Sequence, residues 1–253
     1  MDSAYDWTED ARKAASALGV ASDIHPEDMI FRWLITNPVF KEKQLAVKYY
    51  LNDGKRSSEI FDGLVTTLLD RPDRPLSVLE FASGYGCVSR HWKTFGDKYE
   101  VVACDIHPQA VDFIATKLGV AAIVSNKDPA ALKIGRQFDI VFALSFFSHM
   151  PARSWERWVR SLLNVVSPNG LLIFTTQGLK SRVHLGEPTL DDEGYWFSPE
   201  SEQKDLPTEE YGQTIVTPSF VFARLARIPE AHPIYFREAS WWNHQDTYAV
   251  RKG

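Results

Sequence analysis

The chain has 253 residues, 44% of them hydrophobic and 24% charged, which is the composition of an ordinary soluble globular protein with a sizeable core. Its formal net charge of −5 makes a broad electrostatic grip on nucleic acid unexpected. The acidic start MDSAYDWTED lacks the apolar stretch of a secretory signal, and no apolar run approaches membrane-spanning length. Cys87 and Cys104 belong to no CxxC pair, so we expect reduced thiols and no metal site. Together with the absence of a signal and of a membrane-spanning run, this predicts a cytoplasmic protein without membrane attachment.

Residues 1–70 are predicted to form an N-terminal helical cap. Apolar residues recur there at helical spacing, and the first stretch has a threonine cap and a glycine stop. The predicted helices are TEDARKAASALG (8–19), HPEDMIFRWLIT (25–36), EKQLAVKYYL (42–51) and SSEIFDGLVTTLLD (57–70). The sequence RPDRP then interrupts the helical pattern before a second region, 71–253.

Strands and helices alternate after residue 71, which indicates a parallel sheet with helices on both faces. The strands read as nearly continuous apolar runs, as expected for strands that are buried on both sides. The predicted strands are 76–81, 99–105, 121–125, 138–144 and 171–176. The predicted helices start near residue 86 and span 108–119 and 154–166, and SPNG (167–170) is predicted to form a turn.

The C-terminal part departs from this rhythm. Residues 177–216 form a long polar excursion, which is followed by a predicted helix over 218–228. Two predicted strands, 233–242 and 246–252, are joined by a tight turn through Asn243 and His244. We therefore expect a doubly wound α/β fold with a mostly parallel, seven-stranded sheet whose last strand is antiparallel.

A glycine-rich turn, in the sequence EFASGYG, follows the first predicted strand. In an open parallel sheet, ligands bind beyond the carboxyl ends of the strands, and Gly84 and Gly86 would let the backbone approach a ligand closely. Asp105 ends the second strand, 19 residues after Gly86, where a carboxylate can accept both hydroxyls of an adenosine ribose. As a dinucleotide fingerprint, G-x-G-x-x-G/A, the stretch from Gly84 to Ser89 is imperfect.

The stretch from Glu80 to Gly86 resembles motif I of the class I S-adenosylmethionine-dependent methyltransferases, with Ala82 where the first glycine is usual. Further stretches are similar to later segments of that family: VVACDIHPQAVDFI, FDIVFALSFFSHMP, LLNVVSPNGLLIFTT and the terminal strand pair. The resemblance covers 76–176 well and 217–253 in outline. In addition, AVKYYLNDGKRSSEIFDGLV and EYGQTIVTPSF are similar to a bacterial subgroup often found near polysaccharide genes.

The resemblance implies S-adenosylmethionine as the cofactor and a set of residues that bind it. Glu80 would shape the glycine turn, Asp105 would bind the ribose, and Asn126 would contact adenine unless it is only a turn asparagine. Leu144 and Ser145 would line the methionine part. The complete expected set is Glu80, Ala82, Gly84, Gly86, Asp105, Ile106, Asn126, Leu144 and Ser145.

Methyl transfer to a hydroxyl requires a base, and histidine suits neutral pH. His244 and His184 follow predicted strand ends on the expected cofactor edge, and His149 is a third candidate that more often packs or caps in this family. Trp241 and Trp242 could form a stacking wall for a sugar, although at least one of them is expected in the core.

The predicted activity is methyl transfer from S-adenosylmethionine to a small-molecule or glycan acceptor, with a hydroxyl favoured. The segment 187–210, with nine acidic residues and one lysine, argues against a nucleic-acid acceptor. One alternative is an NAD(P)-dependent oxidoreductase, which would need a second nucleotide-binding half after the fifth strand. The other is a non-catalytic S-adenosylmethionine-binding module without an open acceptor pocket. The oligomeric state stays open.

Overall fold

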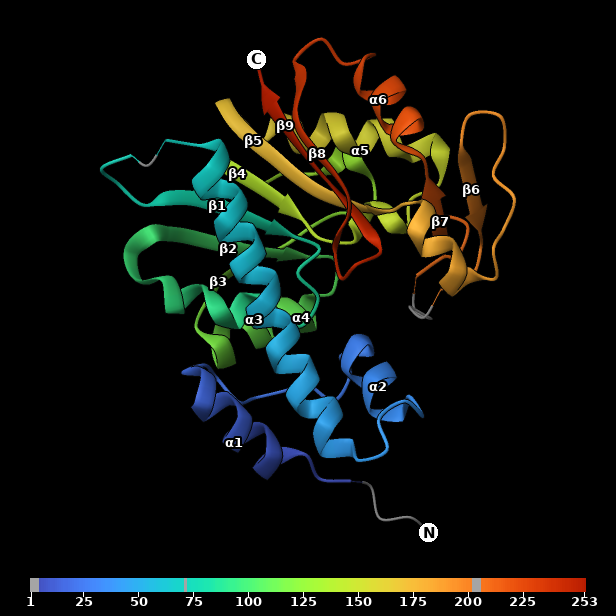
Figure 1. The fold of residues 1–253 in the computed structure, drawn as a ribbon. Helices are drawn as coiled ribbons and strands as arrows, with labels where there is room; N and C mark the ends of the chain where they lie inside the picture. The colour runs from blue at the N-terminus through green and yellow to red at the C-terminus, as the bar shows by residue number, and fades with distance from the viewer. Residues whose placement is uncertain (1–4, 71, 202–205) are drawn as a thin grey trace. The chain divides into compact units, whose positions relative to one another are not determined.

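The computed structural model describes residues 5–70, 72–201 and 206–253 (Figure 1). Its main sheet has seven strands in the order β3-β2-β1-β4-β5-β9-β8, and a second sheet pairs β6 with β7. The strands are β1 (Leu76–Phe81), β2 (Tyr99–Asp105), β3 (Ala121–Val124), β4 (Phe138–Ala143), β5 (Val166–Gln177), β6 (Tyr195–Ser198), β7 (Gln213–Val216), β8 (Ala231–Trp241) and β9 (Gln245–Lys252). This topology confirms the predicted α/β class, with β9 antiparallel to both of its neighbours.

The chain divides into two compact units, which are described separately. The first contains the residues up to Leu76 together with Ser83–Val124, and the second contains Ser77–Ala82 together with Ser125–Gly253. The helical segments of the first unit are α1 (Thr8–Leu18), α2 (Met29–Thr36), α3 (Lys43–Leu68), the 3-10 segment η1 (Ser89–Lys98), α4 (Pro108–Phe113) and the π-helical turn η2 (Ile114–Leu118). Those of the second are η3 (Pro129–Ala131), η4 (Phe146–Ser148), α5 (Ala152–Asn164), η5 (Leu179–Leu185) and α6 (Pro218–Leu225).

The prediction of two helices over 42–51 and 57–70 was wrong, because α3 runs without a break from Lys43 to Leu68. Gly54 lies in the middle of this helix and does not interrupt it. A side-chain carbon at Gly54 would lie 2.0 Å from the carbonyl oxygen of Cys87, so glycine is required there for close packing rather than for a turn. The helix therefore lies directly against the backbone that follows the glycine-rich turn.

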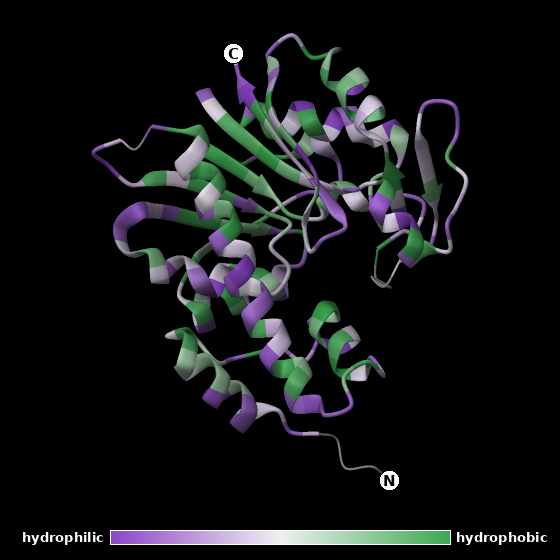
Figure 2. Ribbon diagram, in the orientation of Figure 1, coloured by the Kyte–Doolittle hydropathy of each residue, from purple (hydrophilic) through white to green (hydrophobic). Residues whose placement is uncertain are grey.

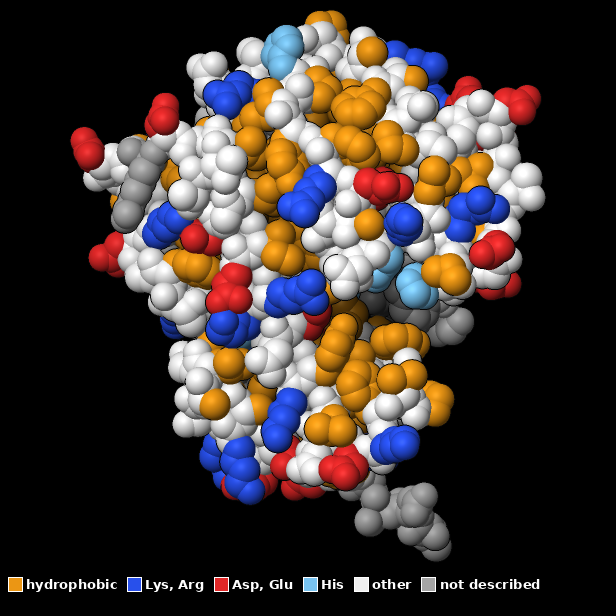
Figure 3. Space-filling model, in the orientation of Figure 1, with side chains coloured by type: hydrophobic (Ala, Val, Ile, Leu, Met, Phe, Trp, Pro, Cys, Tyr) orange, Lys and Arg blue, Asp and Glu red, His pale blue; other side chains and the backbone are white. Residues whose placement is uncertain are grey.

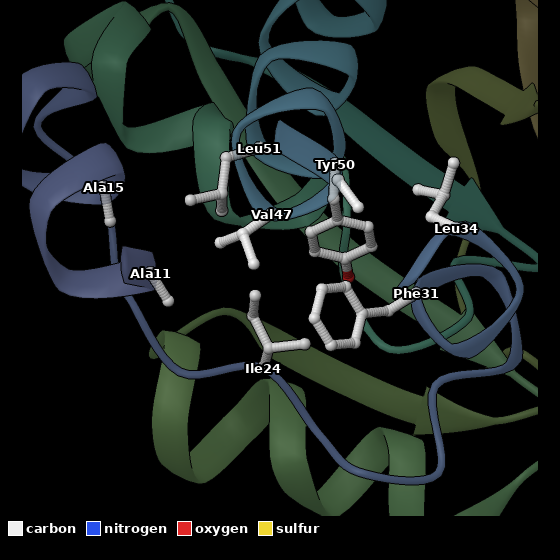
Figure 4. Packing of buried hydrophobic residues seen from close by; sticks show 9 residues of the cluster. Ala11, Ala15, Ile24, Phe31, Leu34, Val47, Tyr50 and Leu51 are labelled. Atoms are coloured by element: carbon white, nitrogen blue, oxygen red, sulfur yellow. The ribbon is translucent and has the colours of Figure 1, made fainter. Parts of the chain in front are cut away.

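A buried cluster joins α1, α2 and α3, and Figure 4 shows Tyr50 and Phe31 in contact within it. In Figure 1, α1 and α2 lie on either side of the N-terminal half of α3. The Tyr50 hydroxyl donates a hydrogen bond of 2.5 Å to Oδ2 of Asp28, which is also buried. Asp28 Oδ1 accepts the amide of Phe31 at 3.0 Å and so caps α2, which is why this helix begins later than the predicted 25–36.

The helix α2 is mostly hydrophobic around its circumference (Figure 2). Its buried residues are Phe31 and Leu34, whereas Ile30 and Trp33 are more than half exposed. Hydrophobic side chains accordingly gather on the surface over α2 in Figure 3. A helix that only covers a core usually has one apolar face, so α2 presents more apolar surface than this role requires.

Two further local predictions were wrong. The helix expected from about residue 86 is the 3-10 segment η1, which is kinked at Gly96, where φ is 58°. The turn predicted at SPNG lies inside β5 as a bulge: Phe138 pairs with Val166, but Ile140 pairs with Leu171. The segment 177–216 is not only a polar loop, since it contains η5 and the hairpin of β6 and β7, although residues 202–205 lie outside the described residues.

The β8–β9 turn lies at the carboxyl end of β5. Gln245 pairs with Gln177 at the end of β5 and with Trp241 at the end of β8. This agrees with the prediction that the turn carrying His244 is on the edge of the sheet where parallel strands end. Within the described residues, no helix is both long and apolar enough to cross a membrane.

The buried pair of Tyr50 and Asp28 provides a test of the first unit's stability. Tyr50→Phe removes the hydroxyl that donates to Oδ2 of the buried Asp28 carboxyl, so the free energy of unfolding should fall by about 1–3 kcal/mol. The neighbouring Tyr49, which is 47% exposed, supplies the matched control Tyr49→Phe, with an expected change within about 0.5 kcal/mol. Urea unfolding followed by circular dichroism measures both, and equal effects would contradict the assignment.

Candidate functional site

The glycine-rich turn is held in place by backbone hydrogen bonds. The amide of Ser83 donates to the carbonyl of Cys104 at 3.1 Å, which attaches the start of the turn to β2. The amide of Gly86 donates to the carbonyl of Ser83 at 3.1 Å and closes the turn. Gly84 and Gly86 have φ values of 55° and 79°, a conformation that favours glycine. The two glycines are therefore required by the local backbone.

Asp105 is the side chain that shapes this turn. Its carboxylate is buried, and Oδ2 accepts the amide of Gly84 at 2.8 Å. Oδ1 accepts the amide of His107 at 3.0 Å and lies 2.8 Å from Nδ1 of the same residue. A bond that shapes the turn is thus made by Asp105, and the same role for Glu80 stays a prediction. Each carboxylate oxygen can accept more than one hydrogen bond, so these contacts leave capacity for a ligand.

The two glycines differ in what surrounds them. A side-chain carbon at Gly84 would meet nothing within 4 Å, so open space faces this residue. At Gly86 it would lie 2.4 Å from Cδ1 of Leu118 and 3.1 Å from Ile114. The missing side chain of Gly86 therefore makes room for the π-helical turn η2, and its contact with a ligand stays a prediction.

Residues in the left-handed conformation follow two neighbouring strands of the second unit. Ala82, after β1, has φ of 58°, and Ser145, after β4, has φ of 59°. This backbone conformation costs a residue other than glycine about 1–2 kcal/mol. Strained backbone of this kind is concentrated at functional sites, and both residues were predicted to contact the cofactor. Ala82, which stands where the family motif usually has glycine, thus adopts a conformation that glycine reaches without strain.

A polar network holds the end of β4. The amide of Ser145 donates to Oγ1 of Thr175 at 2.7 Å, and that hydroxyl donates to Oε1 of Gln245 at 2.7 Å. Nε2 of Gln245 in turn donates to Oγ of Ser145 at 2.9 Å. The network joins the carboxyl end of β4 to the β8–β9 turn. Sequence reasoning missed Thr175 and Gln245, although polar residues at the ends of buried strands were a usable signal.

The remaining predicted cofactor residues occupy varied settings. Glu80 is buried within β1, and Ile106 and Leu144 are half-buried at the ends of β2 and β4. Asn126 is exposed, and its Oδ1 accepts the amide of Asp128 at 2.9 Å, which is the bond of a turn asparagine. Asn126 therefore makes the hydrogen bond of a turn asparagine, and its contact with adenine stays a prediction.

The turn that carries His244 has an unusual backbone. Trp242 and Asn243 both have positive φ, 51° and 61°, and the amide of His244 donates to the carbonyl of Trp241 at 3.1 Å. Successive residues of positive φ suit a tight hairpin turn, but glycine or asparagine usually occupies them. A tryptophan there stores strain. Trp241 is fully buried against Phe142, as expected for one of the two tryptophans.

His244 and His184 lie together. Their ring centroids are 5.1 Å apart, and the hydroxyl of Ser181 donates to the carbonyl of His244 at 2.8 Å, which attaches η5 to the turn. Nδ1 of His244 lies 3.0 Å from the carbonyl of Trp242, so this nitrogen carries the proton and Nε2 has the lone pair. Burial, with a smaller contribution from His184, lowers the pKa of His244 and so favours the neutral ring.

His149 lies elsewhere in the second unit. Its ring stacks on Tyr211 with centroids 4.4 Å apart, and Nδ1 lies 2.8 Å from the carbonyl of Gly212. The amide of Gly212 donates back to the carbonyl of His149 at 3.0 Å. These contacts anchor the excursion after β5, and they are those of a packing residue.

The glycine-rich turn also has the features of an adenosine-binding site. The hydroxyl oxygen of Ser83 is buried and has no hydrogen-bond partner among the described residues. It stands next to Gly84, where an added side-chain carbon would meet no atom within 4 Å. A donor, an open glycine and a buried carboxylate fit the amino-acid and ribose groups of a nucleoside cofactor. Within the described part of the chain, no three side chains of histidine, cysteine, aspartate or glutamate are grouped to hold a metal ion.

Comparisons with known proteins agree with this fold. The family model described as a methyltransferase domain matches residues 78–170. A methyltransferase structure from Methanosarcina mazei is 16% identical, with a TM-score of 0.55 over 75% of this chain and 96% of the other. The glycopeptide N-methyltransferase MtfA, complexed with S-adenosylmethionine, is 12% identical, with a TM-score of 0.57 over 79% of this chain and 95% of the other.

A third similar structure is CalS10, an amino pentose methyltransferase from Micromonospora echinaspora, at 14% identity with a TM-score of 0.53 over 81% of this chain and 92% of the other. No curated protein matches the sequence significantly. The solved structures share the fold, and the family match identifies the domain. The chain therefore carries a methyltransferase domain, matched over residues 78–170, with the class I, Rossmann-like fold, and S-adenosylmethionine is its cofactor.

Proposed function

We propose that this enzyme transfers the methyl group to a hydroxyl oxygen of a small molecule or sugar, with His244 as the general base. The observation that carries the proposal is the orientation of the His244 imidazole, whose Nδ1 is hydrogen-bonded to the carbonyl of Trp242 so that Nε2 keeps the lone pair. Its turn lies at the edge of the sheet where the parallel strands end, which is where ligands bind in such folds. The net charge of −5 supports a small acceptor rather than nucleic acid.

The cofactor would be held by the glycine-rich turn and the strand ends beside it. Asp105 would accept hydrogen bonds from the ribose hydroxyls, and Gly84 would allow the backbone to approach. Ile106, directly after Asp105, would contact the cofactor as well. When bound, S-adenosylmethionine supplies a methyl group on a positively charged sulfur.

The residues around the acceptor would move one proton. A hydroxyl is a weak nucleophile, so Nε2 of His244 would accept its proton as the oxygen–carbon bond forms. A lowered pKa keeps the histidine in its basic form down to mildly acidic pH. His184 would stabilise the turn or take over part of this role, since its ring touches that of His244. The half-buried Trp242 offers an aromatic face to a sugar ring.

A nitrogen acceptor is the second candidate. The solved structures of similar fold include a glycopeptide N-methyltransferase, an amino pentose methyltransferase and a 1,6-didemethyltoxoflavin-N1-methyltransferase from Burkholderia thailandensis. An amine that arrives protonated must also lose a proton, so a neutral histidine would serve either acceptor. The oxidoreductase alternative has less support, because η5, a hairpin and the β8–β9 pair follow β5 instead of a second nucleotide-binding half.

The acceptor atom can be tested with matched sugars. Pairs of sugars that differ only in a hydroxyl or amino group at one carbon should be incubated with the enzyme and S-adenosylmethionine, and products identified by mass spectrometry. We expect O-methyl products, with less than about one tenth of that rate on the amino sugar. Methylation of the amino sugar alone would establish the nitrogen candidate, and cofactor binding without transfer to any acceptor would favour a binding module.

The ribose role of Asp105 can be separated from its role in the turn. Asp105→Ala should weaken S-adenosylhomocysteine binding by about 1.5–3 kcal/mol, because charge-assisted hydrogen bonds are lost. Calorimetry with the 2′,3′-dideoxy analogue distinguishes the two roles: the wild type should prefer the natural ligand, and the variant should bind both equally. Asp112→Ala, an exposed aspartate on α4, is the charge-matched control. A variant that keeps the full preference would remove Asp105 from the ribose site.

The base assignment predicts a pH-dependent loss. His244→Ala should reduce turnover by about 10²–10⁴, the usual worth of general base catalysis, while S-adenosylhomocysteine affinity barely changes. Turnover of the wild type should rise with pH through a pKa below the usual 6.5 of histidine, because the protonated ring cannot act as a base. The variant should lose this step.

Two histidine variants serve as controls for that experiment. His232→Ala changes an exposed residue on the edge strand β8 and should leave turnover unchanged. His184→Ala should reduce turnover less than His244→Ala if the second ring only supports the first. Full activity of the His244 variant would instead assign the base to His184 or His149.

A further inference from the structure

Arg90 connects the glycine-rich turn to the N-terminal segment. The side chain is buried, and its Nε donates to the carbonyl of Gly86 at 3.2 Å. Its NH1 group donates to the carbonyl of Ala21 at 3.0 Å and to that of Asp23 at 2.9 Å. One guanidinium thus bonds the backbone of the turn and that of a segment nearly 70 residues earlier. A buried charge is stable only where its hydrogen bonds offset the free-energy cost of removing it from water.

A second contact joins the same two parts of the chain. The ring of His25 stacks on that of Tyr85, the residue between the two glycines, with centroids 4.5 Å apart and an angle of 16° between the rings. His25 also contacts Phe113 of α4 edge-on at 5.2 Å. Segment 21–28 therefore packs on the side chain of Tyr85. Arg90 also links the backbone of this segment to the backbone of the turn through hydrogen bonds to both.

The far end of this segment is attached to α3, which packs on the same turn. Asp28, after His25, accepts the hydroxyl of Tyr50. The thiol of Cys87 donates to the carbonyl of Tyr50 at 3.3 Å, and Gly54 lets α3 approach the carbonyl of Cys87. Segment 21–28, α3 and the turn are consequently fastened to one another within one compact unit.

We propose that segment 21–28 is a positioning element of the cofactor site, with Arg90 and His25 as the residues through which it acts. The inference rests on the proposed cofactor binding at the glycine-rich turn. A turn with positive φ at two residues is held in shape by contacts from outside it, and pre-shaping a binding loop increases affinity. Coupling is reciprocal, so bound cofactor must also stabilise the docked segment.

Arg90→Met tests the hydrogen-bonded connection. It keeps the apolar part of the side chain and should raise the dissociation constant for S-adenosylhomocysteine at least about tenfold, as expected for hydrogen bonds to a charged group. Lys93→Met is the matched control, since Lys93 is an exposed cation on the same segment η1, and it should change the constant by less than about twofold. Arg90→Lys keeps the charge and should recover part of the affinity.

Hydrogen exchange supplies a readout that loss of stability alone would not move. In the wild type, S-adenosylhomocysteine should slow exchange of the amides of residues 21–28. In Arg90→Met, saturated with the same ligand, this protection should be lost while the strands β4 and β5 remain protected. Ligand-independent exchange of residues 21–28 in the wild type would overturn the proposal.

The aromatic contact gives an independent pair of variants, which also covers the case that Arg90→Met does not fold. His25→Ala removes the stack on Tyr85 and should raise the dissociation constant about fivefold, whereas His25→Phe keeps an aromatic ring and should restore it. Unchanged affinity in His25→Ala and Arg90→Met would overturn the proposal and leave the cofactor site intact. Failure of the wild type to bind the ligand would instead refute the proposed function.

Discussion

The hydrogen bond between the carboxylate of Asp105 and the amide of Gly84 is the constraint on which the glycine-rich turn depends. It makes the last residue of β2 part of the turn, so a buried charge and a left-handed glycine stabilise each other. The same carboxylate orients His107 at the start of α4. One side chain thereby sets the geometry of the turn and of the following helix. Asp105 therefore has a structural role at the end of β2 in addition to its proposed role in ribose binding.

Close packing of backbone segments in the first unit also determines the shape of the turn. Gly54 and Gly86 are both required because a side chain at either position would overlap a neighbour, Cys87 in one case and Leu118 in the other. The turn is therefore enclosed by α3 and by η2. Its shape follows from the whole unit, and Arg90 adds the hydrogen bonds that bring segment 21–28 into the same assembly.

In the second unit, strained backbone at the ends of strands must be stabilised by neighbouring residues. Ser145 and Trp242 both adopt positive φ without being glycine. The network through Gln245 stabilises Ser145, and the fully buried Trp241 anchors the turn that carries Trp242 and His244. Each strained residue costs about 1–3 kcal/mol, so rigid neighbours are needed to maintain it. The candidate base thus lies on a hairpin turn that is anchored by the buried Trp241 and by the hydrogen bond from Ser181.

The sequence by itself predicted the seven strands of the main sheet, the glycine-rich turn, the position of Asp105 at the end of β2 and that of the His244 turn, because hydrophobic periodicity and turn residues act over short distances. It could not reveal that α3 continues through Gly54, that Gly86 serves packing against Leu118, or that Asp105 bonds Gly84. It also did not pair His184 with His244, or His25 with Tyr85. These features join residues that are far apart in the chain, and only the tertiary structure decides which distant surfaces come into contact.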